Sequence, residues 1–255
     1  MDAYTLEQRD GIGILRLQAG GANALNERVL QALKTGLRQA EKLKLNGLVL
    51  TGYERFFCAG LDLIATYELN RKQMSRFLED FDVAFKHLFS FPRPVVAAIN
   101  GSATAGGCIL ALACDYRVMA ADAGVIGLNE IRLGLPLPAV ALEIARFSLP
   151  PERATYVLYS GKLFSPPEAV SAGLLHEVAP AENLLATAIA RLHEFADHPG
   201  EACAPVKTAL RSTALAQMTK NAGSMREAFL DAWFSHAARN AIDTVRRQLL
   251  DKKRN

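Results

Sequence analysis

The segment from Val95 to Cys114 carries no charged side chain. A run of this length without charge is typical of a membrane span or of segments buried inside a large core. Glycine and polar residues interrupt its middle, which argues against a span; they are Asn100, Gly101, Ser102, Thr104, Gly106 and Gly107. We therefore predict a buried strand at 95–99, a glycine turn and a buried helix from Gly106 to Ala113, with no membrane span.

Short apolar runs alternate with helical patterns through the first part of the chain. Strands are predicted at 11–17, 47–51 and 116–120. Helical spacing begins after two candidate caps, Asn26 and Ser75. Prolines at 92 and 94 end the second of these helices.

The chain beyond Pro151 is predicted to be mostly helical, and the periodicity from Met225 to Leu250 indicates one terminal amphipathic helix. Strand–helix units followed by helices favour an α/β fold with a helical C-terminal part. We place the core at residues 1–195 and the helical region at 196–255.

Composition excludes several classes of function. The net charge of +3 is too small to indicate a nucleic-acid partner. The four cysteines form no C-x-x-C pair, and His193 and His198 have no accompanying zinc motif, so we expect free thiols and no metal. The N-terminus lacks the pattern of a signal peptide, which predicts a cytoplasmic protein, or a mitochondrial matrix protein if this is a mature form.

Two segments of small residues, 55–63 and 100–108, each follow a predicted strand. Small residues allow backbone N–H groups to approach a ligand closely. Two such donors directed at one oxygen form an oxyanion hole, which stabilises negative charge developing on a carbonyl group. The pair of segments therefore indicates chemistry on a carbonyl compound.

Glu130 is the strongest candidate for a catalytic acid or base. It stands between apolar residues, and burial would raise its pKa toward neutrality, as a general base requires. The alternative is a surface glutamate paired with Arg132. We expect Asp62 to bind backbone in a turn, and Asp115 to bind buried backbone or pair with Arg117.

Cys58 and Cys108 stand beside the two candidate donor segments. A nucleophilic thiol is conceivable there, but no histidine is nearby in sequence, so packing is the better interpretation.

Several motifs together resemble the crotonase (enoyl-CoA hydratase/isomerase) superfamily. They are Phe57-Cys58-Ala59-Gly60-Leu61-Asp62-Leu63, Arg93-Pro94-Val95-Val96-Ala97-Ala98-Ile99-Asn100-Gly101, Ala105-Gly106-Gly107-Cys108, Cys114-Asp115-Tyr116-Arg117 and Ile126-Gly127-Leu128-Asn129-Glu130. The resemblance implies a spiral of ββα units followed by a helical region used in trimer assembly. It also implies a homotrimer, or a hexamer built as a dimer of trimers.

The resemblance further implies an acyl-CoA thioester substrate and an enolate held by two backbone N–H groups, those of Leu61 and Gly106. Substrate-binding positions carried over from the family are Ala59, Gly60, Leu61, Asp62, Leu63 and Gly106. No cofactor is implied, because CoA is part of the substrate.

One departure from the family pattern narrows the reaction. Hydratases of this family carry a glutamate three residues after the oxyanion glycine, where this chain has Ile109, and a second one at the position of Glu130. A single glutamate resembles the mitochondrial-type isomerases, which move the double bond of a 3-enoyl-CoA to give 2-trans-enoyl-CoA in fatty-acid β-oxidation. A further departure, at Leu135–Val140, where hydratases are rich in glycine, points the same way.

Two alternatives remain open at this point. One is an enoyl-CoA hydratase or another crotonase-type lyase or hydrolase; the other is a non-catalytic acyl-CoA-binding protein. Tyr67, Phe77, Phe81 and Phe85 are candidates for an acyl pocket, and a core role serves them equally well.

Overall fold

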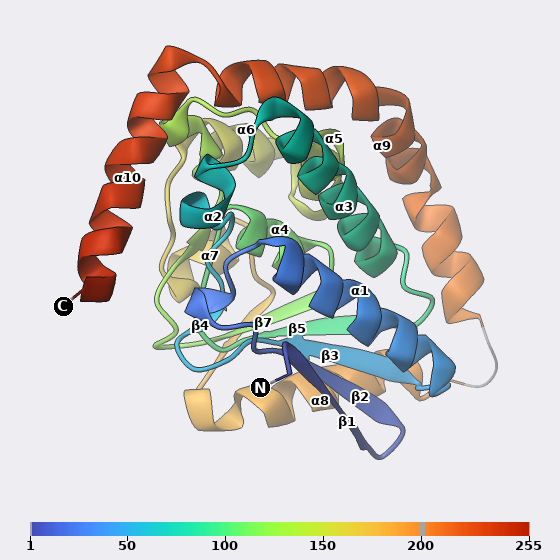
Figure 1. The fold of residues 1–255 in the computed structure, drawn as a ribbon. Helices are drawn as coiled ribbons and strands as arrows, with labels where there is room; N and C mark the ends of the chain where they lie inside the picture. The colour runs from blue at the N-terminus through green and yellow to red at the C-terminus, as the bar shows by residue number, and fades with distance from the viewer. Residues whose placement is uncertain (1, 199–201, 255) are drawn as a thin grey trace.

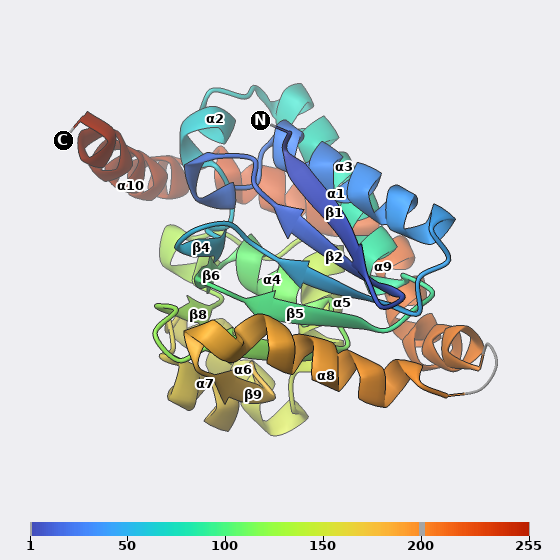
Figure 2. The same cartoon turned by 90° about the horizontal axis from the view of Figure 1, so that it is seen from below.

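A computed structural model describes residues 2–198 and 202–254. Two sheets form the centre of the molecule (Figure 2). The larger has the strand order β1 (Tyr4–Arg9), β2 (Ile12–Leu17), β3 (Gly47–Thr51), β5 (Val95–Ile99), β7 (Tyr116–Ala120) and β9 (Glu177–Ala179). Only the β1–β2 pair is antiparallel. The smaller, all-parallel sheet has the order β4 (Phe56–Cys58), β6 (Ser102–Thr104) and β8 (Ile126–Gly127).

Helices cover both faces of the larger sheet (Figures 1 and 2). On one side α1 (Glu27–Lys42) contacts β1 and β2 and packs against α3 (Arg71–Phe89). On the other side α8 (Leu184–Ala196) crosses β3, β5 and β7. Burial on both faces explains why β3 and β5 are apolar throughout rather than alternating.

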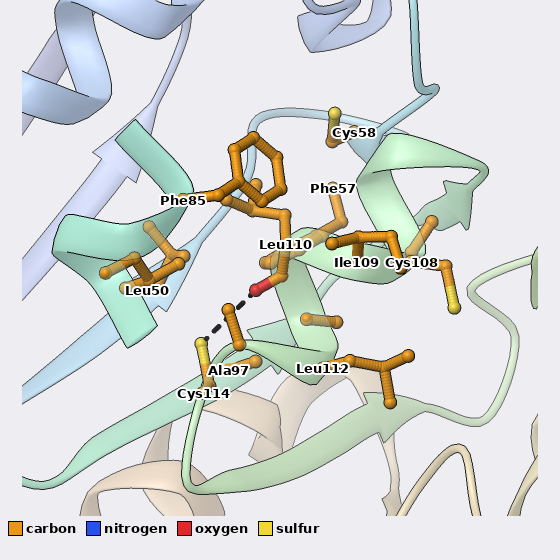
Figure 3. Packing of buried hydrophobic residues seen from close by; sticks show 14 of the residues in the cluster. Leu50, Phe57, Cys58, Phe85, Ala97, Cys108, Ile109, Leu110, Leu112 and Cys114 are labelled. Atoms are coloured by element: carbon orange, nitrogen blue, oxygen red, sulfur yellow. Dashed lines mark hydrogen bonds between the residues drawn. The ribbon is translucent and has the colours of Figure 1, made fainter. Parts of the chain in front are cut away.

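The uncharged segment forms β5, β6 and α4 (Gly106–Leu112), as the buried strand–turn–helix prediction requires. Every residue of α4 is buried. Figure 3 shows α4 packed among side chains from α3 and the two sheets, with the Cys114 thiol 3.6 Å from the Leu110 carbonyl oxygen. Within the described residues, no helix combines the length and apolar character that a bilayer crossing needs.

Local signals set most helix starts, and one of our predictions for them is wrong. The Asn26 side chain accepts a hydrogen bond from the Val29 N–H, which confirms it as the cap of α1. The cap of α3 is Asn70 rather than Ser75: Asn70 and Gln73 each accept a hydrogen bond from the other's backbone N–H. This reciprocal pair starts the helix earlier, and Ser75 lies inside it.

The predicted terminal helix is in fact parts of two helices, α9 (Cys203–Trp233) and α10 (His236–Arg254). The Ser235 hydroxyl accepts a hydrogen bond from the Ala238 N–H and so caps the start of α10. α9 runs over α3 and α5 (Ala139–Ser148). α10 turns back along α2 (Leu63–Tyr67) and the 3-10 helix η2 (Glu130–Leu133), and its far end projects from the body (Figures 1 and 2).

Short elements complete the chain: η1 (Gly21–Asn23), α6 (Pro151–Ser160), α7 (Pro166–Ser171) and η3 (Ala181–Asn183). The α/β fold with C-terminal helices is confirmed. The boundary between residues 195 and 196 stays a prediction.

Candidate active site

A cavity of about 630 Å³ lies where the two glycine-containing segments meet η2 and α10. Its wall is mostly apolar. It is lined by Ala22, Ala24, Phe56, Ala59, Leu61, Asp62, Leu63, Ile64, Leu78, Phe81, Thr104, Ala105, Gly106, Ile109, Asn129, Glu130, Leu133, Leu135, Leu137, Pro138, Ala141, Phe229, Val245, Leu249 and Lys252. A concave, mainly apolar site with few polar groups is the usual form of a small-molecule site.

The two segments are in direct contact. A side chain at Gly60, which has φ +81°, would place its Cβ 2.8 Å from the Thr104 carbonyl oxygen and 3.4 Å from the Gly106 nitrogen. The Thr104 hydroxyl donates to the Ala59 carbonyl at 3.1 Å, which ties the segments together. Glycine at position 60 is therefore required by both backbone conformation and space.

The Leu61 N–H is oriented by its pairing with Leu25. Leu25 donates to the Gly60 carbonyl at 2.7 Å and accepts from the Asp62 N–H at 3.0 Å. In such a parallel bridge the residue between the two bonded neighbours directs its own N–H away from the partner. Leu61 itself lines the cavity.

Gly106 is the first residue of α4, where backbone N–H groups have no acceptor within the helix. The preceding residue, Ala105, has φ +52°, an uncommon conformation for a residue with a side chain. Its N–H donates to the Gly127 carbonyl at 2.8 Å, and this bond holds the turn in place. The structure thus places Leu61 and Gly106, the two residues expected to donate their N–H groups, at one cavity wall.

Glu130 begins η2 and lines the same cavity. Its Oε2 atom is buried and has no hydrogen-bond partner among the described residues. Burial raises the pKa of Glu130 to about 7, and backbone N–H groups of Glu130 and Asn129 offset this only in part. No ion pair joins it to Arg132 or another described residue, so the surface-glutamate alternative is wrong.

Among the described residues that line the cavity, Glu130 is the only carboxylate with an oxygen free to bind a substrate. Ile109 also lines the cavity, and its buried side chain carries no acidic group. Asp62 also lines it, but both of its oxygens are bonded. One accepts from the N–H groups of Ile64 and Ala65, and the other accepts from the Asn26 amide at 3.1 Å. Asp62 caps α2, which confirms the predicted backbone-binding role.

Comparison with known proteins decides the family. The family described as "Enoyl-CoA hydratase/isomerase" matches residues 7–245. The chain belongs to the enoyl-CoA hydratase/isomerase family. It is therefore an enzyme of the crotonase superfamily, whose enoyl-CoA isomerase and hydratase activities belong to fatty-acid metabolism.

Members of this family with different reactions resemble the chain. It is 29% identical to mouse "Enoyl-CoA delta isomerase 1, mitochondrial", over 95% of this chain and 83% of that protein. It is 32% identical to "2,3-dehydroadipyl-CoA hydratase" of Escherichia coli, over 84% of this chain and 83% of that protein. The human mitochondrial delta3-delta2-enoyl-CoA isomerase structure superposes with a TM-score of 0.90 at 25% identity, covering 98% of this chain and 99% of that one. Since one relative is named mitochondrial and another is bacterial, the compartment stays a prediction.

Among the substrate-binding positions taken from the family pattern, Ala59, Leu61, Asp62, Leu63 and Gly106 line the cavity. Gly60 is not among the lining residues, and it lies close to Ala105. The roles of these residues in binding stay predictions.

The other candidates have structural explanations. Cys58 and Cys108 are fully buried, and burial raises the pKa of both thiols, that of Cys58 to about 12. They pack, as predicted. Asp115 accepts from the buried Val95 N–H, but its ionic partners are Lys207 and Arg211 of α9, not Arg117. Arg117 instead donates to backbone carbonyls, chiefly that of Leu174.

His193 pairs with Asp197, and no cluster of three metal-binding side chains occurs in the part of the chain that the structure describes.

Of the four aromatic candidates for an acyl pocket, only Phe81 lines the cavity. Sequence reasoning missed the contribution of the C-terminal helices, namely Phe229 of α9 and Val245, Leu249 and Lys252 of α10. The signal available was the amphipathic pattern of this region, which shows that a helix packs but not on which surface.

Proposed function

We propose that this enzyme moves the double bond of a 3-enoyl-CoA to give the 2-trans-enoyl-CoA, as needed in fatty-acid β-oxidation. The observation that carries the proposal is the Oε2 atom of Glu130, which is buried without a hydrogen-bond partner among the described residues, in an apolar cavity that Leu61 and Gly106 also line. Its pKa of about 7 suits a group that must both accept and release a proton near neutral pH.

In the proposed mechanism, the thioester oxygen accepts hydrogen bonds from the N–H groups of Leu61 and Gly106. Glu130 removes a proton from C2, and the electrons of that C–H bond form a dienolate whose charge lies largely on the thioester oxygen. Each donor would stabilise this charge by about 3 kcal/mol. Glu130 then returns the proton to C4, so that the C3–C4 double bond becomes a C2–C3 double bond. The reaction neither gains nor loses atoms.

Ile109 supports isomerisation over hydration. Adding water requires a group that holds and deprotonates the water molecule, and the isoleucine side chain offers no hydrogen-bonding atom there. The isomerases among similar proteins support the same choice. We propose that no cofactor is needed beyond the CoA of the substrate, and that the enzyme assembles as a homotrimer or a dimer of trimers.

The decisive experiment compares two reactions in the same preparation: isomerisation of 3-hexenoyl-CoA and hydration of crotonyl-CoA. We expect rapid isomerisation and little hydration. Glu130→Gln should lower kcat for isomerisation by about 10²- to 10⁴-fold, because general-base catalysis typically contributes this much. Wild-type rates in this variant would refute the role of Glu130.

The rival functions predict different results. A hydratase would hydrate crotonyl-CoA faster than it isomerises 3-hexenoyl-CoA. A non-catalytic acyl-CoA-binding protein would bind the ligand but would not exchange its C2 protons with solvent deuterium. Ile109→Glu, which supplies a second carboxylate, should raise hydration relative to isomerisation.

A further inference from the structure

The short helix α2 starts two residues after the proposed donor Leu61 and is held at both ends by other elements. It spans only Leu63–Tyr67, too few residues for a helix that persists without outside contacts. At its start, Asp62 caps the helix and accepts a hydrogen bond from the Asn26 amide. The Leu25 bridge and the Asn26–Asp62 bond hold the side of α2 next to Leu61, and the opposite end of α2 is held separately.

Two guanidinium groups of α10 fix that other end at Tyr67. The Arg239 guanidinium carbon lies 3.4 Å from the centre of the Tyr67 ring, and that of Arg246 lies 4.4 Å from it. Arg239 also donates to the Tyr67 carbonyl oxygen at 2.9 Å, which satisfies a carbonyl at the end of α2. Arg246 pairs in addition with Glu68 at 3.4 Å.

The same helix reaches the other half of the candidate site. α10 contacts η2, the element that carries Glu130, and it lines the cavity with Val245 and Leu249. It lies along α2 in both views of the molecule (Figures 1 and 2). One helix thus contacts both α2, which follows Leu61, and η2, which carries Glu130.

We propose that Tyr67, Arg239 and Arg246 are positioning residues, which hold α2 and thereby the Leu61 N–H in the place where it stabilises the enolate. None of the three lines the cavity, so they act through the backbone of α2 rather than on the substrate. The expected change in kcat rests on the proposed function. The expected change in ligand binding does not, because binding is measurable without turnover.

Both guanidinium groups contact the ring of Tyr67, so two substitutions at this position can test the contribution of the ring. Tyr67→Leu removes the ring, and Tyr67→Phe keeps it. We expect Tyr67→Leu to lower kcat for 3-hexenoyl-CoA by about tenfold or more with a smaller change in KM, because a donor displaced by a fraction of an ångström loses its effect mainly in the transition state. Tyr67→Phe should leave kcat near the wild-type value.

Acetoacetyl-CoA provides a readout that a merely structural role would not change. This ligand enolises, and its enolate absorbs in the near ultraviolet, so the absorbance of the bound ligand reports on stabilisation of the enolate. We expect Tyr67→Leu to bind acetoacetyl-CoA with a reduced enolate signal and Tyr67→Phe to give the wild-type signal. Tyr116→Leu is the matched control. Tyr116 stacks on His176 away from the cavity, so its loss should lower stability without changing the enolate signal.

A folded Tyr67→Leu with wild-type kcat and enolate signal would overturn the proposal, as would a Tyr67→Phe variant as impaired as Tyr67→Leu. If Tyr67→Leu does not fold, Arg239→Met and Arg246→Met apply the same test from α10, because they remove the stacking cations and leave the ring. If the wild type shows no isomerisation, the proposed function fails, while the acetoacetyl-CoA signal still tests the positioning role.

Discussion

Two cavities of similar size differ in how their acidic residues are paired. The candidate active site measures about 630 Å³, and a second cavity of about 650 Å³ lies near the amino-terminal ends of β5 and β7. In the second, Asp115 accepts from Lys207 at 2.6 Å, Arg211 at 2.7 Å and the Val95 N–H at 2.7 Å. In the first, the Oε2 atom of Glu130 has no partner among the described residues.

The difference shows how ion pairing distinguishes a carboxylate that stabilises the fold from one that can take part in catalysis. A partly buried carboxylate that binds two buried cations and a backbone donor joins elements distant in the chain, here α9 and the sheet, and has little capacity left for a substrate. A buried carboxylate without a cation is costly to ionise and exchanges its proton near neutral pH. The four predictions below test this contrast, from the largest expected effect to the smallest.

Asp115→Asn should destabilise the fold by about 3–5 kcal/mol, because it leaves two buried cations without their counter-charge. Urea denaturation measures this loss, and kcat of the folded fraction should stay at the wild-type value. Glu177→Gln is the control: its ion pair with Arg191 is partly exposed, and its loss should cost less than about 1 kcal/mol. A catalytic defect in folded Asp115→Asn would break the contrast.

Gly60→Ala should lower kcat by about 10²- to 10³-fold, the usual effect of losing one oxyanion donor. Its Cβ would lie 2.8 Å from both the Ala105 Cβ and the Thr104 carbonyl oxygen, so the two donor segments must separate. Gly20→Ala is a matched control, because Gly20 has a similar φ of +82° and no atom within 4 Å of the added Cβ. Equal losses of kcat in both variants would show that backbone strain, not donor geometry, is responsible.

The pH profile of kcat/KM should follow the ionisation of Glu130. Burial raises the pKa of Glu130 to about 7, and only the ionised form removes a proton. We expect kcat/KM to level off above pH 7 and to fall about tenfold per pH unit below it. Burial also raises the pKa of Asp82 on α3, to about 6, so Asp82→Asn is the control and should leave the profile unchanged. A profile flat from pH 5 to pH 8 would exclude Glu130 as the base.

Glu130→Gln should stabilise the folded protein at pH 8, in contrast to Asp115→Asn. The pKa of Glu130 is higher in the folded state than its ordinary value of 4.5, so the folded protein binds more protons than the unfolded chain between these values. The contribution of Glu130 to stability therefore falls as pH rises from about 4.5 to 7. We expect a gain of about 1–3 kcal/mol for the variant at pH 8 and none below pH 4.5, measured by urea denaturation. A loss of stability at pH 8 would show that Glu130 is paired.

The chain's local patterns were sufficient to predict much of this fold. Glycine and polar residues within the uncharged run favoured burial over a membrane span, and the run forms β5, β6 and α4 as expected. Strong caps such as Asn26 also act within one turn of the chain. The incorrect cap at Ser75 and the unpredicted break at Ser235 both concern helix starts: Asn70 caps α3 through a local capping box with Gln73, and Ser235 caps α10 inside an apolar pattern that continues across the break.

By itself, the sequence determined the family, the glycine turns and the apolar surroundings of Glu130, because these depend on residue type and on neighbours along the chain. Only the tertiary structure decided which acids are paired. It joined Asp115 to α9, left the Oε2 atom of Glu130 without a hydrogen-bond partner among the described residues, and brought α10 against α2 and η2. These contacts unite residues far apart in sequence, and neither periodicity nor spacing records which distant surfaces meet.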